Sequence, residues 1–198
     1  MAATEIRRAT AADATYLAAL VDIASEGFAS YFWSGMAQEG QSPFEVGRAR
    51  AMREEGAFTW RNAWIAEVDR QVAGALVGYP IGDSVDKANV AEASELIRPL
   101  VELEAEVPGY WYVNVLAVFS EYRGTGVGRA LLTEADAIGR RAGTRGMAII
   151  VASGNTVAMR LYRRLGYEEH ARRPLVPFPG YRRAGEWILM TKSHGREA

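Results

Sequence analysis

Hydrophobic residues along this chain follow two different spacings, and the change from one to the other predicts the secondary structure. Apolar or alternating runs typical of β-strands occupy residues 5–9, 60–68, 71–79, 110–118, 147–152, 168–172 and 186–192. Apolar residues at every third or fourth position predict helices over residues 10–24, 43–55, 88–98, 126–142 and 155–167. Residues 25–42 show neither spacing and are expected to be irregular. The pattern as a whole indicates a mixed α/β fold.

Composition narrows the class of protein. Of the 198 residues, 49% are hydrophobic and 24% are charged, as in an ordinary soluble globular protein. No apolar run approaches the roughly 20 residues of a membrane-spanning helix, and the first residues contain no hydrophobic signal core. We therefore expect a cytoplasmic protein without a membrane partner. Because the chain has no cysteine and only His170 and His194, disulfides and thiol chemistry are excluded and a metal site is not expected.

The charge is unevenly distributed along the chain. Residues 1–122 carry a net charge of −9 and residues 123–198 a net charge of +8, which together give the overall −1. A basic half suits a polyphosphate ligand, and an acidic half can attract a cationic substrate. The basic residues form no long run interleaved with aromatic residues, so we expect no nucleic-acid partner.

A glycine-rich turn lies between the strand pattern of residues 110–118 and the helix pattern that follows it. The turn contains Gly124, Gly126 and Gly128, flanked by Arg123 and Arg129. Free backbone amides at a helix N-terminus bind phosphate oxygens, and glycine allows the close approach that this requires. The turn lacks the lysine and hydroxyl residue of a P-loop, and Arg129 stands where a dinucleotide motif has its third glycine. A phosphate-bearing ligand of another kind is therefore expected.

Two motifs resemble those of the GNAT superfamily of acetyl-CoA-dependent N-acetyltransferases. The first is R-x-x-G-x-G, formed by Arg123, Gly126 and Gly128 after a strand that ends in Leu-Ala-Val. The second resembles the family's N…A…LY…GF segment and follows about thirty residues later; it comprises Asn155, Ala158, Leu161, Tyr162, Leu165, Gly166 and Tyr167. The resemblance covers nearly the whole chain outside residues 80–109. It implies one domain over residues 1–198, with a helical insertion at about 80–109.

The resemblance also implies the arrangement of the fold. In this family a central, twisted, mixed and mostly antiparallel sheet lies between layers of helices. We expect about six or seven strands and about four helices in such a three-layer fold. The fourth and fifth strands are expected to splay apart and admit the pantetheine arm of CoA.

Acetyl-CoA is accordingly the expected co-substrate, with no metal. The residues expected to contact it are Leu116, Ala117, Val118, Arg123, Gly124, Thr125, Gly126, Val127, Gly128, Arg129, Asn155, Ala158 and Tyr162. For Asn155 two roles stay open, a contact to the pantetheine arm and a helix N-cap.

The resemblance assigns two catalytic roles. The backbone amide of Leu116 is expected to polarise the thioester carbonyl as an oxyanion donor, while an amine attacks the thioester directly. Tyr162 matches the tyrosine that acts in the family as general acid for the departing thiolate. The alternative for Tyr162 is that its ring only fills the space between helix and sheet.

No general base can be named from the sequence. Many relatives carry a carboxylate on the central strand, whereas residues 110–118 contain no acid. Asn114 could hold a water that relays the proton, and release through solvent or Tyr112 is equally open. Glu26 and Glu67 are further candidates without geometric support.

Several features leave alternatives for the function. The segment 80–109, with Glu102, Glu104 and Glu106 close together and Pro99 interrupting a helix pattern, can be a lid, a dimer contact or decoration. Four aromatic residues within 28–33 can belong to the core or to the wall of an acceptor pocket. The expected acceptor is the primary amine of a small molecule or peptide. Alternatives are a catalytically silent acyl-CoA sensor and an enzyme that acetylates proteins or aminoacyl-tRNA; a homodimer is compatible with each.

Overall fold

The computed structural model describes residues 3–84, 87–181 and 185–194. Within these residues the chain forms two compact units. The first unit comprises residues 3–78, 114–135 and 179–181, and the second comprises residues 79–84, 87–113, 136–178 and 185–194. The chain enters each unit more than once, and the expected single domain stays a prediction.

Seven strands form one sheet in the order β1-β2-β3-β4-β5-β7-β6. Their bounds are β1 Thr4–Arg8, β2 Ala63–Val68, β3 Gln71–Pro80, β4 Trp111–Val118, β5 Gly146–Ala152, β6 Glu168–Pro174 and β7 Glu186–Ser193. β4 and β5 are parallel, whereas the pairs β1–β2, β2–β3, β5–β7 and β6–β7 are antiparallel. The mixed, mostly antiparallel sheet predicted from the sequence is thereby confirmed.

The helices differ more from the expectation. The described residues contain α1 Ala14–Ala24, α2 Phe28–Ser34, α3 Pro43–Ala51, α4 Lys87–Glu92, α5 Arg98–Glu104, α6 Val127–Arg141 and α7 Thr156–Arg164. The prediction of about four helices is therefore too low. Residues 28–34 are helical, although 25–42 was expected to be irregular. Residues 88–98 are not one helix, because the chain leaves helical structure after Glu92 and Pro99 lies in the first turn of α5, a position that proline tolerates.

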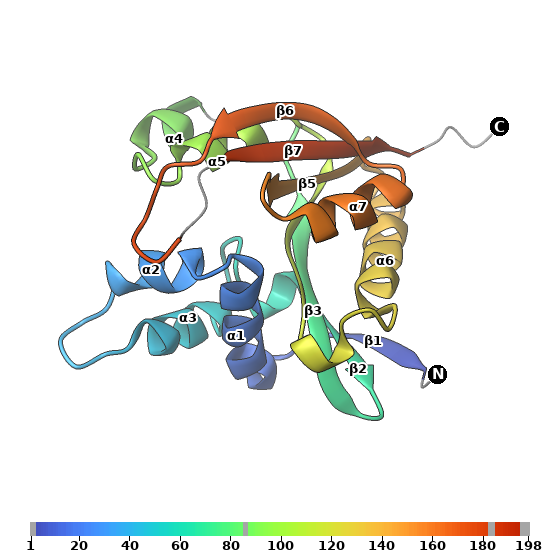
Figure 1. The fold of residues 1–198 in the computed structure, drawn as a ribbon, viewed down its shortest axis with the longest axis horizontal. Helices are drawn as coiled ribbons and strands as arrows, with labels where there is room; N and C mark the ends of the chain where they lie inside the picture. The colour runs from blue at the N-terminus through green and yellow to red at the C-terminus, as the bar shows by residue number, and fades with distance from the viewer. Residues whose placement is uncertain (1–2, 85–86, 182–184, 195–198) are drawn as a thin grey trace. The chain divides into compact units, whose positions relative to one another are not determined.

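In the first unit, α1, α2 and α3 pack together, as the blue and cyan helices of Figure 1 show. Trp33 of α2 is 3% exposed and stacks on Phe58 with ring centroids 5.9 Å apart. A Cβ on Gly47 of α3 would lie 2.3 Å from the Trp33 ring, so only glycine leaves room for the indole. Trp33 is thus a core residue, whereas Tyr31 is exposed.

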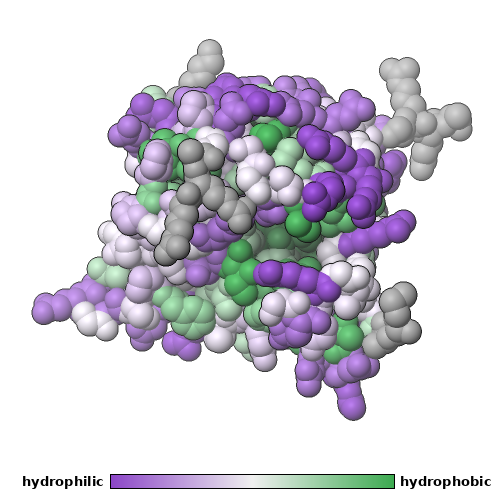
Figure 2. All heavy atoms as spheres, in the orientation of Figure 1, coloured by the Kyte–Doolittle hydropathy of each residue, from purple (hydrophilic) through white to green (hydrophobic). Residues whose placement is uncertain are grey.

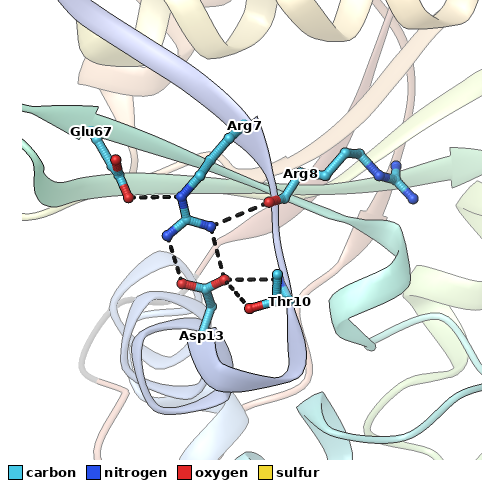
Figure 3. Close-up of polar contacts among 5 residues, drawn as sticks. All are labelled: Arg7, Arg8, Thr10, Asp13 and Glu67. Atoms are coloured by element: carbon cyan, nitrogen blue, oxygen red, sulfur yellow. Dashed lines mark hydrogen bonds and ion pairs between the residues drawn. The ribbon is translucent and has the colours of Figure 1, made fainter.

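An ion-pair network joins β1, α1 and β2 in the same unit (Figure 3). The Arg7 guanidinium donates to both oxygens of Asp13 at 2.8 and 2.9 Å and to Glu67 at 2.7 Å. Asp13 also accepts hydrogen bonds from the amide and hydroxyl of Thr10 at 2.8 and 3.0 Å, as in a capping box. The Arg7 hydrogen bonds lower the pKa of the nearly buried Asp13 carboxyl.

The second unit contains a separate apolar cluster. Its buried members are Leu103, Val107, Tyr112, Ala148 and Leu189, which come from α5 and the segment after it, β4, β5 and β7. β4 is joined to β5 in register from Trp111↔Met147 to Val113↔Ile149. The opening expected farther along these strands stays a prediction.

The surface mixes polar and apolar residues, as the face drawn in Figure 2 shows. Among residues 3–84, 87–181 and 185–194, no helix combines the length and the apolar character needed to cross a bilayer.

Candidate active site

The glycine-rich turn of the first unit has the backbone geometry expected of an anion site. Gly124 has φ = 79° and Gly126 has φ = 101°, backbone angles that residues other than glycine rarely adopt. A Cβ at either position would meet nothing within 4 Å, so the space over the turn is open. The turn leads into α6, whose first amides have no intrahelical acceptor and lie at the positive end of the helix dipole.

Other contacts fix this turn to the end of β4. The Arg123 Nε donates to the carbonyl of Val118 at 3.2 Å, and the Thr125 hydroxyl donates to the carbonyl of Tyr122 at 2.7 Å. A Cβ on Gly74 of β3 would lie 2.6 Å from the Ala117 carbonyl oxygen, so glycine permits the close approach of these two backbones. The predicted residues 116–129 thus form one continuous strand, turn and helix start.

The second motif lies on α7 of the second unit. Asn155 caps this helix, because its Oδ1 accepts the backbone N–H of Ala158 at 3.1 Å. Of the two roles considered for Asn155, the structure contains the N-cap, and a contact to the pantetheine arm stays a prediction. Gly166, at φ = 87°, follows the helix in the left-handed conformation typical of a helix end.

Tyr162 is buried in the second unit. Its side chain is 5% exposed, and its ring lies 6.0 Å from the ring of Tyr167. Burial raises the pKa of the Tyr162 hydroxyl well above its usual range, so the proton stays on the oxygen at physiological pH. The packing role weighed for Tyr162 is therefore present, and its role as general acid stays a prediction.

Glu104 is a titratable group that the sequence did not single out. It is the last residue of α5, and it accepts a hydrogen bond from the Tyr112 hydroxyl of β4. Burial raises the pKa of the Glu104 carboxyl to about 7. Tyr112 is itself 3% exposed and meets Tyr79 edge to face at 5.7 Å.

The structure gives less support to the general-base candidates that the sequence suggested. Glu67 is held by the Arg7 guanidinium in the network described above, which accounts for its place on β2. Asn114 is partly buried on β4, and Glu26 occupies a left-handed turn at φ = 51°. In the part of the chain that the structure describes, no group of three acids or histidines is arranged to hold a metal ion.

The predicted site residues divide between the two units. Residues 116–118 and 123–129 belong to the first unit and are brought together there. Asn155, Ala158 and Tyr162 belong to the second unit and share one helix. Glu104 and Tyr112 also belong to the second unit.

Known proteins share this architecture. The crystal structure of an acetyltransferase matches with a TM-score of 0.65 and 19% identity, covering 96% of this chain and 98% of the other. The ribosomal-protein-alanine N-acetyltransferase from Brucella melitensis matches at 0.62 and 23% identity, with coverages of 96% and 99%. The structure of yncA from Salmonella typhimurium with its cofactor acetyl-CoA matches at 0.60 and 20% identity, with coverages of 99% and 97%. At these identities the likeness shows the fold alone.

A comparison with curated protein sequences gave no match. The model of the acetyltransferase (GNAT) family, in contrast, matches residues 31–167, which include the glycine-rich turn and the α7 motif. This match spans more than half of the chain and agrees with the motifs read from the sequence. The chain therefore belongs to the GNAT acetyltransferase family.

Proposed function

We propose that this protein transfers the acetyl group of acetyl-CoA to the primary amine of a small molecule or peptide. Membership of an acetyltransferase family supports the acetyl transfer. The observation that carries the proposal is the turn at Gly124–Gly126, open above its backbone and followed by the N-terminus of α6. Such a turn suits the pyrophosphate of CoA, with Arg123 and Arg129 as exposed cations beside it.

The reaction proceeds by direct attack. The amine nitrogen bonds to the thioester carbonyl carbon, and the carbonyl oxygen gains negative charge that the Leu116 amide stabilises. The tetrahedral intermediate then collapses with loss of the CoA thiolate. The nitrogen loses one N–H proton to solvent as the amide forms, and the thiolate takes one up, so that a neutral amine and acetyl-CoA become an amide and free CoA.

Tyr162 stabilises the departing sulfur. Its raised pKa keeps a proton on the phenol, but it also makes complete transfer of that proton to a thiolate unfavourable, since an ordinary thiol has a pKa of about 8.5. The hydroxyl therefore acts chiefly by donating a charge-assisted hydrogen bond to the sulfur as it leaves. The ring packs against Tyr167, and the oxygen carries the chemistry.

A cationic acceptor suits the charge distribution. Residues 1–122 carry a net charge of −9, which favours an amine-bearing molecule in its protonated form during encounter. The similar Brucella protein is named for an alanine of a ribosomal protein, which favours the alternative of an enzyme that acetylates proteins. The aromatic residues considered for the acceptor pocket include Tyr31, which is exposed.

Binding and turnover test this proposal separately. CoA and acetyl-CoA at 100-fold excess over Kd should each stabilise the fold by about 2.7 kcal/mol, seen as a rise in melting temperature. With acetyl-CoA present, a panel of polyamines, amino acids and N-terminal peptides should release free CoA thiol. Absence of any melting shift would reject the CoA site, and a shift without thiol release from any amine would reject the enzyme.

A melting shift without release of CoA thiol would favour the alternative of an acyl-CoA sensor. That alternative rests on the lack of an acid within residues 110–118, where many relatives carry one. The position of Glu104 against Tyr112 weakens it, because a carboxylate does reach this strand from α5.

A further inference from the structure

A hollow in the first unit is lined by none of the residues assigned to acetyl transfer. It has a volume of about 400 Å³ and is formed by α3 and by the loop between α2 and α3, which Figure 1 draws. Its apolar lining comes from Met36, Val46 and Ala49, and its cations are Arg50 and Arg53. Small-molecule sites occupy roughly 300–1,000 Å³, so the hollow is large enough for a small organic ligand.

Arg50 brings an unsatisfied guanidinium to this hollow. Its Nη1 lies 3.7 Å from the Met36 sulfur, which is only a weak acceptor. Its Nε is buried and, within the described part of the chain, donates to no acceptor. Buried donors without an acceptor are rare in folded proteins, because they have lost water and gained nothing in return. A ligand with an acceptor atom would satisfy this N–H.

Arg53 adds a second positive charge beside the first. Its Nε donates to the Arg50 carbonyl at 3.2 Å, which leaves the two Nη groups for another acceptor. Burial and, to a smaller extent, the charge of Arg53 lower the pKa of Arg50. Guanidinium groups nevertheless stay protonated, so two cations that repel one another remain at the hollow. An anion bound to both would offset the repulsion and the lost hydration.

The acids nearest in the sequence leave this charge uncompensated. Glu45 caps the start of α3, and Glu54 pairs with Arg61. Glu39 and Glu55 are exposed, and neither forms an ion pair within the ranges that the structure describes. The hollow therefore keeps a positive charge that a ligand can use.

Two glutamine side chains complete the lining and add donors to it. The Gln41 Oε1 accepts the backbone N–H of Gln38 at 3.2 Å, so the amide nitrogen of Gln41 is the end left for a ligand. The hollow thus opposes in sign the net charge of −9 over residues 1–122. Cationic and amide donors next to apolar walls suit an anion that carries a hydrocarbon part.

We propose that this hollow binds the carboxylate of a small aliphatic acid, with Arg50 and Arg53 as donors to its two oxygens. A planar guanidinium matches the geometry of a carboxylate, and the hydrogen bonds are strengthened by charge. The hydrocarbon part of the ligand packs on the apolar wall formed by Met36, Val46 and Ala49. This binding goes beyond acetyl transfer and does not depend on it.

NMR of the arginine Nε–H groups tests the proposal directly. Butyrate, titrated at constant ionic strength, should move the Arg50 Nε–H resonance to lower field in a saturable manner, because that proton gains an acceptor; Arg50→Lys assigns the resonance. Butyramide has the same shape without the charge, and it should leave the resonance unchanged, as should chloride. An equal shift with butyramide or chloride, or no saturable shift with butyrate, would overturn the proposal.

Variants on and beside the hollow identify the residues that bind. Arg53→Gln removes one charged donor and should weaken butyrate binding about tenfold, measured by the same Arg50 resonance. Arg48→Gln is the matched control, since Arg48 lies exposed on α3 and does not line the hollow. It should keep the wild-type Kd. Equal Kd values for Arg53→Gln and Arg48→Gln would contradict the assignment.

Unfolding in urea distinguishes a binding role of Arg50 from a packing role. Arg50→Met removes the desolvated charge but keeps a long side chain, so without ligand the variant should be at least as stable as wild type. Butyrate should stabilise wild type and not Arg50→Met. A variant that is less stable than wild type, or that butyrate still stabilises, would show that Arg50 is a packing residue and not the anion donor.

Inorganic phosphate and CoA separate a carboxylate site from a phosphate site. Phosphate lacks a hydrocarbon part and should bind more weakly than butyrate, and CoA should not displace butyrate from the hollow. Tighter binding of phosphate, or displacement by CoA, would assign the hollow to phosphate groups and overturn the proposal. All of these measurements omit the acceptor amine, so their failure leaves the proposed acetyl transfer standing.

Discussion

Two carboxylates, one in each unit, show opposite responses to burial. Asp13 receives two hydrogen bonds from Arg7 and two from Thr10, and its pKa is lowered. Glu104 receives the Tyr112 hydroxyl, and its pKa is raised to about 7. Among the described residues, Asp13 is paired with a cation and the partner identified for Glu104 is a neutral hydroxyl. An acid paired with a cation contributes to stability, whereas a buried acid held by a neutral donor lowers it.

Tyr162 belongs with Glu104 in this comparison, because burial alone accounts for its raised pKa. Tyr162→Phe should lower kcat by about 10²-fold, since the hydroxyl no longer stabilises the departing thiolate. The melting temperature and the Kd for CoA should change little, because the ring remains. Steady-state kinetics with a verified acceptor gives the result, and a kcat within twofold of wild type, with chemistry rate-limiting, would retire Tyr162 as the donor.

Asp13→Asn should have the largest effect on folding. The variant leaves Arg7 without a charged partner at α1 and should lower the free energy of unfolding by about 2 kcal/mol, less than for a fully buried pair because Arg7 is partly exposed. In the wild type, the folded pKa of Asp13 lies below its unfolded value, so this stability is present above the unfolded pKa. It is lost as pH falls through the folded pKa.

Urea unfolding of wild type and Asp13→Asn between pH 3 and 7 measures the difference. The difference in unfolding free energy between the two proteins should decrease toward acid pH. A gap that is constant across this range would show that the ion pair is not what Asp13 contributes.

Glu104→Gln should change the free energy of unfolding in the opposite direction to Asp13→Asn. Because the folded pKa of Glu104 lies above its unfolded value, stability falls as pH rises from about 4.3 to about 7 in the wild type. The amide keeps an acceptor for Tyr112 without the charge, so the variant should be more stable than wild type by about 1 kcal/mol at pH 8. The same unfolding series checks this, and destabilisation of Glu104→Gln at pH 8 would break the comparison with Asp13.

The sequence predicted the local elements of the CoA segment well. Strand β4, the turn and α6 were expected because glycine spacing, a strand-type run and a helical stripe adjoin one another over residues 110–142. The capping arrangement at Thr10 and Asp13 is equally local, since its partners are three residues apart.

Features that depend on distant residues were not predicted. Helix α2 is rich in aromatic residues with modest helix propensity, and it is stabilised by the space that Gly47 leaves for Trp33. In the sequence, Glu104 cannot be distinguished from Glu102 and Glu106. The structure distinguishes them, because Tyr112 donates to Glu104 whereas Arg173 pairs with Glu102. Which of three similar acids pairs with a cation within the described part of the chain depends on tertiary packing and leaves no mark in local spacing.

The central claim is that the glycine-rich turn holds the pyrophosphate of CoA. Gly126 and Gly40 both have positive φ, at 101° and 79°, and a Cβ on either would meet nothing within 4 Å. Alanine at each should therefore cost a similar backbone strain of about 1 kcal/mol, but only Gly126 lies in the proposed site.

Calorimetric titration of CoA into wild type, Gly126→Ala and Gly40→Ala tests this claim most directly. Wild type and Gly40→Ala should bind CoA with the same Kd, and Gly126→Ala should bind at least about tenfold more weakly, because a methyl group and an altered backbone disturb the phosphate contacts. Equal affinity of all three proteins, or no binding by wild type, would contradict the account.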